Sequence, residues 1–491
     1  MQIGAGVRKV SNRKTPHRRS ERAIMNVNVT APTTGTTRQV SEFAVNLRYE
    51  DLPKEVISDA KRCILDSFGC GLFGSPKPWT QSVSRVVDSL GQSKKASAWG
   101  SSLRADPLGA AFINGTAAQG FELDDCHDQS MSHYGAGVVP AVIASAEGFG
   151  KFDGKQIILA TVVGYELGTR IGNTVSPHAF HRGFHPCGLT STFASAAAIG
   201  KMLRLDTDQF VSALGLAGSQ AAGLMASQFG AMAKRFHSGK ASQNGIIAAL
   251  CAREGLTGVR DVLEAPYGGF CSTYAEKYDL SWATNGLGSE FEMRKNGFKQ
   301  YSSLASSQTS VDALRKIRER TGIRGEDVEK VLIRTTKMVH VHCGWPYVPK
   351  ETITAQMNLP YTAAVTLLEG NAFVDQYADH KLRDPKIIDL ANRIEVVIDP
   401  ELDAMGPHEM RAVRATVTMK SGEKHDQEQI YRSGHWKNPL SDETLKAKFR
   451  DLAGRVLKAE AVEKVASIVA DLENQPEPAV ALGAALQQVK S

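Results

Sequence analysis

"GLTSTFASAAAIGKML", residues 188–203, carries Gly, Ala, Ser and Thr on nearly every side of a helical repeat. Small side chains let the backbones of neighbouring helices approach closely, so a helix of this composition can be buried on most of its faces. The stretch therefore predicts a central helix of an all-α domain.

Segments on both sides of this stretch have the same small-residue composition or a helical spacing of apolar residues. Two of them begin with an acidic residue and a nearby proline, which the first turn of a helix tolerates. The expected helices are "DLPKEVISDAKRCILDSFGCGLFG" (51–74), "DPLGAAFINGTAAQGFEL" (106–123), "GKQIILATVVGYELGTRIG" (154–172), "DTDQFVSALGLAGSQAAG" (206–223) and "KASQNGIIAALCAREG" (240–255). Together they predict a helical domain over residues 38–275.

The pattern changes after residue 275. "VEKVLIRTTKMVHV" (328–341), "RIEVVIDP" (393–400) and the pair 412–431, which turns at Ser421-Gly422, are typical of strands, and 354–370 is typical of a helix. We expect an α+β domain over residues 276–437. An amphipathic helix at 440–457 suggests that residues 438–491 rejoin the helical domain. The predicted fold is mainly α with a second α+β domain.

Composition excludes several classes of protein. The chain has 491 residues, of which 42% are hydrophobic, so it can bury a large core. No apolar run is long enough for a membrane span. The seven cysteines show no CxxC pairing, which favours reduced thiols and a cytoplasmic protein. The net charge of +6 comes from residues 1–24, and the neutral remainder gives no reason to expect a nucleic-acid partner.

Residues 1–37 form a basic leader. Its seven Lys and Arg residues lie within 1–24 and face Glu21 as the one acid there. We expect a disordered tail, with a translation start at Met25 or an Arg-rich organellar transit segment as alternatives. The pair Arg18-Arg19 is followed by no apolar segment, so an export signal is not expected.

A polar stretch, "GFELDDCHDQSMSHYGAG" at 120–137, follows one of the predicted helices. It holds four acids, two histidines and a cysteine. A metal site is one interpretation, although the spacing matches no ligand signature such as HExxH. A solvated loop is a second interpretation. The third is acid–base chemistry, because a carboxylate beside a histidine can tune and orient it.

Two further stretches favour the third interpretation. "HAFHRGFHPCG" (178–188) and "GAMAKRFHSGKASQNG" (230–245) place histidines together with Lys and Arg just before small-residue helices. A helix N-terminus beside a basic side chain is a good site for a carboxylate. The three stretches together predict a pocket for a small polyanion, with histidines that move protons.

These stretches resemble the MmgE/PrpD family, which contains 2-methylcitrate dehydratases, cis-aconitate decarboxylases and an iminodisuccinate epimerase. The resemblance covers residues 38–470 and lies in "AAFINGTAAQGFELDDCH", "SHYGAGVVPAVIASAE", "GFHPCGLTSTFASAAAIGKML", "AKRFHSGKASQNGIIAALCAREGLTG", "YGGF" and "AQMNLPYTAAV". It implies a helical domain and a smaller α+β lid with the active site between them. It also implies a homodimer that needs no metal or organic cofactor.

The resemblance implies a set of site residues. Glu122, Asp124, His133, His185 and Lys234 match positions expected to be catalytic. The expected substrate-binding residues are Asp125, Arg182, Arg235, Lys299 and Tyr301. A helix-end or salt-bridge role for Asp125 is an equal alternative, and His127 is expected to be structural or exposed. Cys126 and Cys187 lie near the expected pocket without a pattern that marks a nucleophile.

The segment "FKQYSSLASSQ" (298–308) departs from the family. The decarboxylases place a catalytic histidine in this segment, whereas Leu304 and Gln308 stand at the corresponding places here. The expected function is a cofactor-free lyase that dehydrates or decarboxylates a small di- or tricarboxylate. An epimerase, a non-catalytic polycarboxylate-binding protein and a metal hydrolase are the alternatives.

Overall fold

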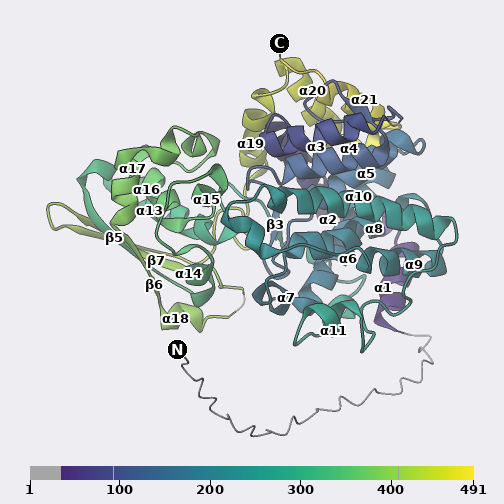
Figure 1. Ribbon diagram of the computed structural model, residues 1–491, viewed down its shortest axis with the longest axis horizontal. Coiled ribbons are helices and arrows are strands. Elements are labelled where there is room, and N and C mark those ends of the chain that lie inside the picture. Colours follow the sequence, from purple (N-terminus) through teal and green to yellow (C-terminus); the bar gives the residue numbers. More distant parts are fainter. Residues whose placement is uncertain (1–34, 92, 407, 491) are drawn as a thin grey trace, which may run out of the picture. The chain divides into compact units, whose positions relative to one another are not determined.

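Helix α8 (Pro186–Met202) lies at the centre of the helical domain and is buried at every position except Lys201. The computed structural model describes residues 35–91, 93–406 and 408–490. Helices α5, α6, α9 and α10 pack around α8 (Figure 1). Gly164 and Gly245 approach α8 closely, because an added Cβ would lie 2.9 Å from the Ala194 carbonyl oxygen and 2.3 Å from the Ser195 Cβ. The small-residue composition of 188–203 thus acts as predicted.

The helical domain is built from the N-terminal helices and three helices from the C-terminal end. The N-terminal set is α1 (Thr36–Asn46), α2 (Lys54–Gly74), α3 (Pro78–Ser89), α4 (Pro107–Ala118), α5 (Gly135–Gly148), α6 (Gly154–Val175), α7 (His178–His181), α8, α9 (Thr207–Gly218), α10 (Ala233–Arg253), α11 (Phe270–Tyr274) and α12 (Ser281–Thr284). Two short ladders, β1 (Ala96–Ser97) with β2 (Arg104–Ala105) and β3 (Cys126–His127) with β4 (Asn296–Gly297), join their loops.

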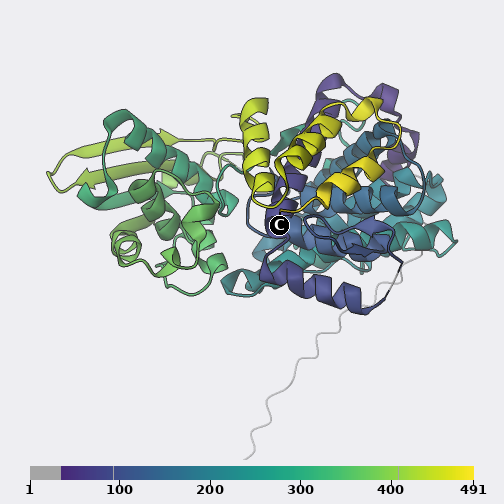
Figure 2. The ribbon, with the colours of Figure 1, turned by 90° about the horizontal axis from the view of Figure 1, so that it is seen from above.

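The C-terminal helices return to this domain, as the amphipathic pattern at 440–457 predicts. They are α19 (Asp442–Gly454), α20 (Ala459–Ala470) and α21 (Pro478–Leu486). Helix α19 packs on α2, where Gly69 faces the backbone of Phe449, and Figure 2 shows all three helices (yellow) lying over the N-terminal helices. The two ends of the described chain therefore share one hydrophobic core.

The α+β domain contains a four-stranded sheet of order β6-β5-β7-β8. Strand β5 (Val328–Thr335) is parallel to β6 (Ile394–Ile398) and antiparallel to β7 (Val413–Met419), which pairs in turn with β8 (Lys424–Gln429). Every second residue of β7 is buried, as in a sheet with one covered face. Helices α13 (Ala305–Thr321) and α16 (Leu359–Glu369) pack against the sheet (Figure 1).

Four more helices complete the α+β domain: α14 (Lys337–Cys343), α15 (Thr352–Gln356), α17 (Pro385–Asn392) and α18 (Pro400–Asp403). Helix α14 corrects the sequence prediction of a strand throughout 328–341. The strand stops at Thr335, and the side chain of Thr336 caps α14 by accepting a hydrogen bond from the Val339 amide. The hairpin at Ser421-Gly422 forms as predicted, with Gly422 at a φ of 89°.

The fold class, a mainly helical domain with a second α+β domain, is confirmed. The domain boundaries at 275 and 437 stay predictions, although the buried residues do divide into two hydrophobic clusters. The leader predicted at 1–37 lies outside the described residues except for its last positions, where α1 begins at Thr36. No helix in the described part of the chain is both long and apolar enough to cross a membrane.

Candidate active site

The polar stretch 120–137 is buried rather than solvated, and Asp125 fixes its course. The carboxylate of Asp125 accepts hydrogen bonds from the Gly135 amide (3.0 Å), the Tyr165 hydroxyl (2.7 Å) and the Asn296 amide nitrogen (2.9 Å). Gly135 begins α5, so this carboxylate lies at a helix N-terminus. Burial, aided by the charge of Asp124, raises the pKa of Asp125 to about 7 although these donors favour its charged form.

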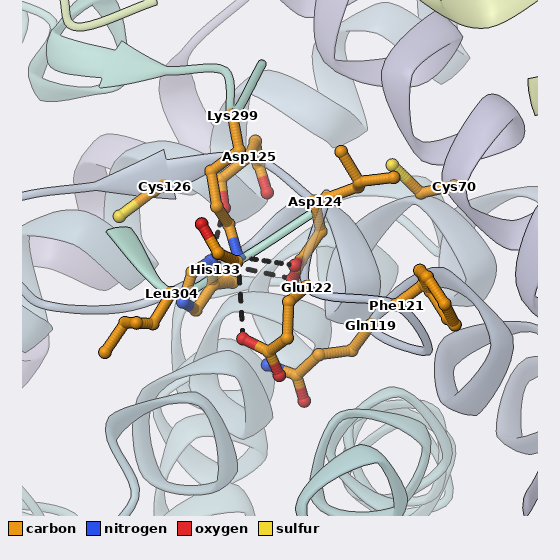
Figure 3. Close-up of polar contacts among 12 residues, drawn as sticks. Cys70, Gln119, Phe121, Glu122, Asp124, Asp125, Cys126, His133, Lys299 and Leu304 are labelled. Carbon is orange, nitrogen blue, oxygen red and sulfur yellow. Dashed lines mark hydrogen bonds and ion pairs between the residues drawn. The ribbon is translucent and has the colours of Figure 1, made fainter. Parts of the chain in front are cut away.

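Lys299 reaches this stretch because strand β4 pairs with β3, which places residue 296 opposite His127. Its Nζ lies 3.1 Å from Asp124 Oδ1 and 3.7 Å from Glu122 Oε2, and its side chain is fully buried. Figure 3 shows Glu122 and Asp124 gathered around Lys299. Burial alone would lower the pKa of Lys299, but the two carboxylates outweigh burial and raise that pKa above its ordinary value.

Glu122 joins Lys299 to a second buried lysine. Lys234, in the first turn of α10, donates a hydrogen bond of 2.6 Å to Glu122 Oε1. Burial would raise the pKa of Glu122, but Lys234, Lys299 and Arg235 hold it well below its usual range. The backbone of Glu122 has a φ of 56°, a left-handed conformation that costs a non-glycine residue free energy and is typical of functional sites.

His133 lies beside this ion cluster in its neutral form. Its Nδ1 donates a hydrogen bond to the Asp125 carbonyl oxygen and lies 3.6 Å from Asp124 Oδ2. Burial, together with the positive charge of Lys299, lowers the pKa of His133 to about 4. A proton held on Nδ1 leaves Nε2 as the free base, which is the state that a general base requires.

His185 occupies the N-cap position of α8, but its side chain forms no capping hydrogen bond. Its Nδ1 lies 2.9 Å from Nδ1 of His237 on α10. Burial, followed by the charge of Lys234, lowers the pKa of His185 well below its ordinary value. Both predicted proton-moving histidines are therefore uncharged at neutral pH.

Four of these side chains line a cavity of about 40 Å³, whereas Asp124, Asp125 and Lys299 do not. That volume holds only a few water molecules, so a larger ligand requires the walls to separate. The helical domain contributes Glu122, His133, His185 and Lys234 to the lining. The α+β domain contributes Leu304, Ser306, His342 and Arg411.

Positive charge exceeds negative charge around the cavity. Asp128, also buried, forms ion pairs with Arg411 (2.5 Å) and Arg432 (3.3 Å), and its second oxygen lies 3.2 Å from Nε2 of His435, whose pKa burial lowers to about 4. Burial would raise the pKa of Asp128, but the two arginines hold it well below its usual range. Among the residues that line the cavity, Lys234 and Arg411 are cations and Glu122 is the carboxylate. Buried charge needs a partner, so the excess favours an anionic ligand.

Arg235, a predicted binding residue, links the two domains instead of lining the cavity. It donates to the Gly120 carbonyl oxygen (3.3 Å) and to the side-chain oxygen of Gln356 on α15 (3.3 Å). Gln356 in turn donates to the Phe121 carbonyl oxygen (3.0 Å). These bonds hold the loop that carries Glu122 in contact with the α+β domain.

Two predicted residues lie away from the cavity. Arg182 is exposed and donates to the Thr273 carbonyl oxygen (2.7 Å). Tyr301 is buried, but its hydroxyl donates to Asp312 (2.7 Å) in the core of the α+β domain. The local sequence could not show that Arg182 and Tyr301 lie away from the cavity, because each stands within four positions of a residue that does reach the site.

His127, predicted to be structural or exposed, is fully buried, so it is not exposed, and its structural role stays a prediction. Its Nδ1 lies 2.9 Å from the Ser130 hydroxyl. Burial raises the pKa of the Cys126 thiol to about 12 and that of Cys187 to about 11, so neither thiol is activated. No three His, Cys, Asp or Glu side chains are grouped as metal ligands within the described ranges 35–91, 93–406 and 408–490.

Sequence reasoning missed Ser306, His342 and Arg411. His342 lies in "HCGWPYVPKETITAQM" (342–357), where a histidine among aromatic residues before a helix was the available signal. Arg411 has no comparable signal, since it lies in the segment that leads into β7. Proton-transfer groups with shifted pKa values, buried beside paired cations, are characteristic of enzymes.

Comparison with known proteins gives the class of enzyme. The sequence matches the MmgE/PrpD N-terminal domain over residues 38–283 and the MmgE/PrpD C-terminal domain over residues 301–474. The chain belongs to the MmgE/PrpD family, as the sequence motifs predict.

Three relatives show the range of this family. A cis-aconitate decarboxylase-like protein, oryM, of Aspergillus oryzae is 30% identical over 91% of this chain and 97% of its own length. A cis-aconitate decarboxylase of Aspergillus terreus is 30% identical over 89% of this chain and 93% of its own. The 2-methylcitrate dehydratase of Escherichia coli is 24% identical over 76% of this chain and 80% of its own. Decarboxylases and dehydratases are lyases, and this chain is an enzyme of their family.

Proposed function

We propose that the protein is a lyase that acts on a small di- or tricarboxylate by proton transfer at a carbon beside a carboxylate. The observation that carries the proposal is the pair of buried lysines, Lys234 and Lys299, that share Glu122 next to a cavity with uncharged histidines. Decarboxylation is the reaction we propose first, because the decarboxylase relatives match more of the chain at higher identity.

In this proposal Lys234 and Lys299 bind substrate carboxylates. A carboxylate that enters the cavity meets cations already fixed by Glu122 and Asp124, so little reorganisation accompanies binding. Arg411 lines the cavity and is a third candidate for this role, because its buried Nε lacks a hydrogen-bond partner among the described residues while its Nη1 pairs with Asp128. Such preorganised charge stabilises the negative charge that develops on a carboxylate in the transition state.

The two reactions require different proton transfers from the histidines. In decarboxylation the electrons of the broken carbon–carbon bond remain on the substrate and are delocalised onto the neighbouring carboxylate. An acid then protonates the carbon. In dehydration a base removes a proton beside the carboxylate, and the β-hydroxyl leaves as water after it gains a proton. We assign these proton transfers to His133 and His185, with Asp124 orienting His133 at 3.6 Å.

A homodimer in the cytoplasm remains part of the proposal, supported by the family resemblance alone. Light scattering of the purified protein checks the first point, since the 53.0 kDa chain would give twice that mass. A mass equal to one chain would contradict it. Fractionation of cells that make the protein checks its location.

Proton NMR in deuterium oxide tests the proposed reaction. The protein is mixed in turn with cis-aconitate, 2-methylcitrate, citrate and small dicarboxylates. Loss of a substrate signal with a new vinyl or methylene signal supports a lyase and identifies its reaction. Deuterium uptake without a new compound favours an epimerase instead, and binding without either change favours a non-catalytic carboxylate-binding protein.

A further inference from the structure

The segment after Lys299 offers the cavity no acid–base side chain. Leu304 lines the cavity, at the place where the family resemblance implies a histidine. Both polar atoms of the Gln308 side chain form hydrogen bonds to the backbone of its own segment. The side-chain oxygen accepts from the Tyr301 amide (3.3 Å), and the side-chain nitrogen donates to the Tyr301 carbonyl oxygen (2.6 Å). Neither residue can exchange a proton with a ligand in the cavity.

A histidine from another element occupies this wall. His342, on α14, lines the cavity together with Leu304 and Ser306. Its Nδ1 lies 3.1 Å from the Ser306 hydroxyl, two residues beyond Leu304, while its Nε2 is buried and has no hydrogen-bond partner among the described residues. The ring of Phe180, from the helical domain, packs edge-on against His342 at 5.2 Å.

We propose that His342 is the acid–base catalyst that the α+β domain contributes to the reaction, in place of the histidine implied at Leu304. The inference rests on the proposed function. A buried imidazole nitrogen without a partner is costly in a core, so its position is explained by a ligand that supplies the partner. Ser306 fixes the ring through Nδ1, and Nε2 is then the atom that exchanges a proton with the substrate.

The charges that face His342 set its protonation. Burial, followed by the positive charges of Lys234 and Arg411, lowers its pKa to about 3, and Glu122 opposes them. A bound polycarboxylate would screen both cations and supply negative charge, so it would raise this pKa. A bound polycarboxylate therefore favours the protonated form of His342, which the acid role requires.

His342→Gln tests this role, because glutamine keeps polar atoms in the cavity but does not titrate. We expect turnover to fall by at least 10²-fold, the usual contribution of a general acid or base. We expect the dissociation constant of propane-1,2,3-tricarboxylate, an unreactive probe measured by calorimetry, to change less than about threefold. Imidazole added to His342→Ala should restore part of the activity, which a purely structural role would not allow.

His340→Gln is the matched control, since His340 lies two residues earlier on the same helix and does not line the cavity. It should keep turnover within twofold of the wild type. Turnover of His342→Gln within threefold of the wild type would overturn the inference and leave the proposed function standing. A wild-type protein that converts none of the carboxylates would instead show that the proposed function fails.

A second observation, the contact between His185 and His237, carries an independent inference. His237 lines a surface groove of about 620 Å³, while His185 lines the cavity of about 40 Å³. Gly223 lies against both histidines, since an added Cβ there would lie 3.2 Å from His185 Cβ and 3.3 Å from His237 Nδ1. The two facing Nδ1 atoms share one proton, because one must donate and the other accept.

We infer that His237 conducts protons between the groove and His185. When His185 gives up a proton inside the cavity, it regains one at Nδ1 from His237, and His237 takes one from solvent at its other ring nitrogen. Each histidine ends uncharged, so no charge is left buried.

His237→Gln tests the relay, with the exposed His181→Gln as its control. We expect steady-state turnover of the variant to fall at least tenfold, while its first turnover keeps the wild-type rate. High concentrations of imidazole buffer should restore the steady-state turnover. Unchanged steady-state turnover without buffer dependence would overturn the relay. A first turnover slowed as much as the steady state would also overturn it, because the defect would then lie in the chemical step.

Discussion

Glu122→Gln should destabilise the protein more than any single surface substitution. Glu122 lies 2.6 Å from Lys234 Nζ and 3.7 Å from Lys299 Nζ. At an effective dielectric constant of about 20 these distances correspond to roughly 6 and 4 kcal/mol of Coulomb attraction, offset by the desolvation of three charges. Removing this carboxylate leaves Lys234 without its partner, while Lys299 keeps Asp124 at 3.1 Å, and we expect a net loss of about 3–5 kcal/mol.

Thermal unfolding followed by circular dichroism measures this loss. We expect the midpoint to fall by roughly 3–5 °C, because a chain of 491 residues has an unfolding entropy of about 1 kcal/mol/K. The pKa of Glu122 is held far below its usual range, so its stabilisation is fully present above the unfolded pKa and disappears as pH falls below about 4. The difference between wild type and variant should therefore be constant above pH 5 and shrink in acid.

Glu463→Gln is the control for this prediction. Glu463 pairs with Arg450 at 2.7 Å, but both side chains are about half exposed, so the substitution should cost less than about 1 kcal/mol. Equal midpoints for the two variants, or a difference that grows in acid, would refute the electrostatic account of the cluster.

Three further predictions concern the same site. Lys234→Met should weaken binding of propane-1,2,3-tricarboxylate at least 100-fold by calorimetry. Lys240→Met, on the same helix but lining the outer groove, should not weaken it, and an equal loss in both variants would contradict carboxylate binding by Lys234. Because the pKa of His133 is about 4, kcat/KM should be halved near pH 4 and fall about tenfold per pH unit below it if His133 acts as a base. If His133 acts as an acid, kcat/KM should fall about tenfold per pH unit above pH 4. A profile flat from pH 3 to 8 would remove His133 from the reaction. The pKa of Asp125 is raised from 3.8 to about 7, so its contribution to stability is present below pH 4 and is lost as pH rises through 7. Relative to Asp125→Asn, the free energy of unfolding of the wild type in urea should fall by up to about 4 kcal/mol between pH 4 and 8. Parallel curves for the two proteins would show that the carboxylate keeps its ordinary pKa.

The fold could be predicted from sequence because its signals are local. Small residues at 188–203 and 240–255 specify close helix packing, and the alternation in 413–419 specifies a half-buried strand. The exception was the segment after Thr335. Its β-branched residues favour a strand, but the cap formed by Thr336 and the loss of sheet partners beyond Thr335 favour a helix.

The site was predictable only in part. Glu122, Asp124 and His133 lie in one short loop, so their proximity follows from the sequence. Lys234 and Lys299 join them through helix α10 and the β3–β4 ladder. The basic stretch 230–245 already indicated that Lys234 belongs to the same pocket, whereas only the family resemblance connected Lys299 beforehand.

What the sequence could not reveal is which side chains of a segment turn inward. Arg182 and Tyr301 turn away from the cavity, toward Thr273 and Asp312. His342 and Arg411 turn toward it from elements more than 100 residues beyond the helical part of the site. Such choices depend on tertiary packing, which no local pattern encodes.

The most direct test of the central claim is a proton NMR time course of cis-aconitate in deuterium oxide, with wild type and Lys234→Met at equal concentration. The account predicts that the wild type replaces the substrate signals by those of a product that carries deuterium from solvent, while the variant leaves the substrate intact. Equal conversion by both proteins would contradict the assignment of this cavity as the site where the proton moves.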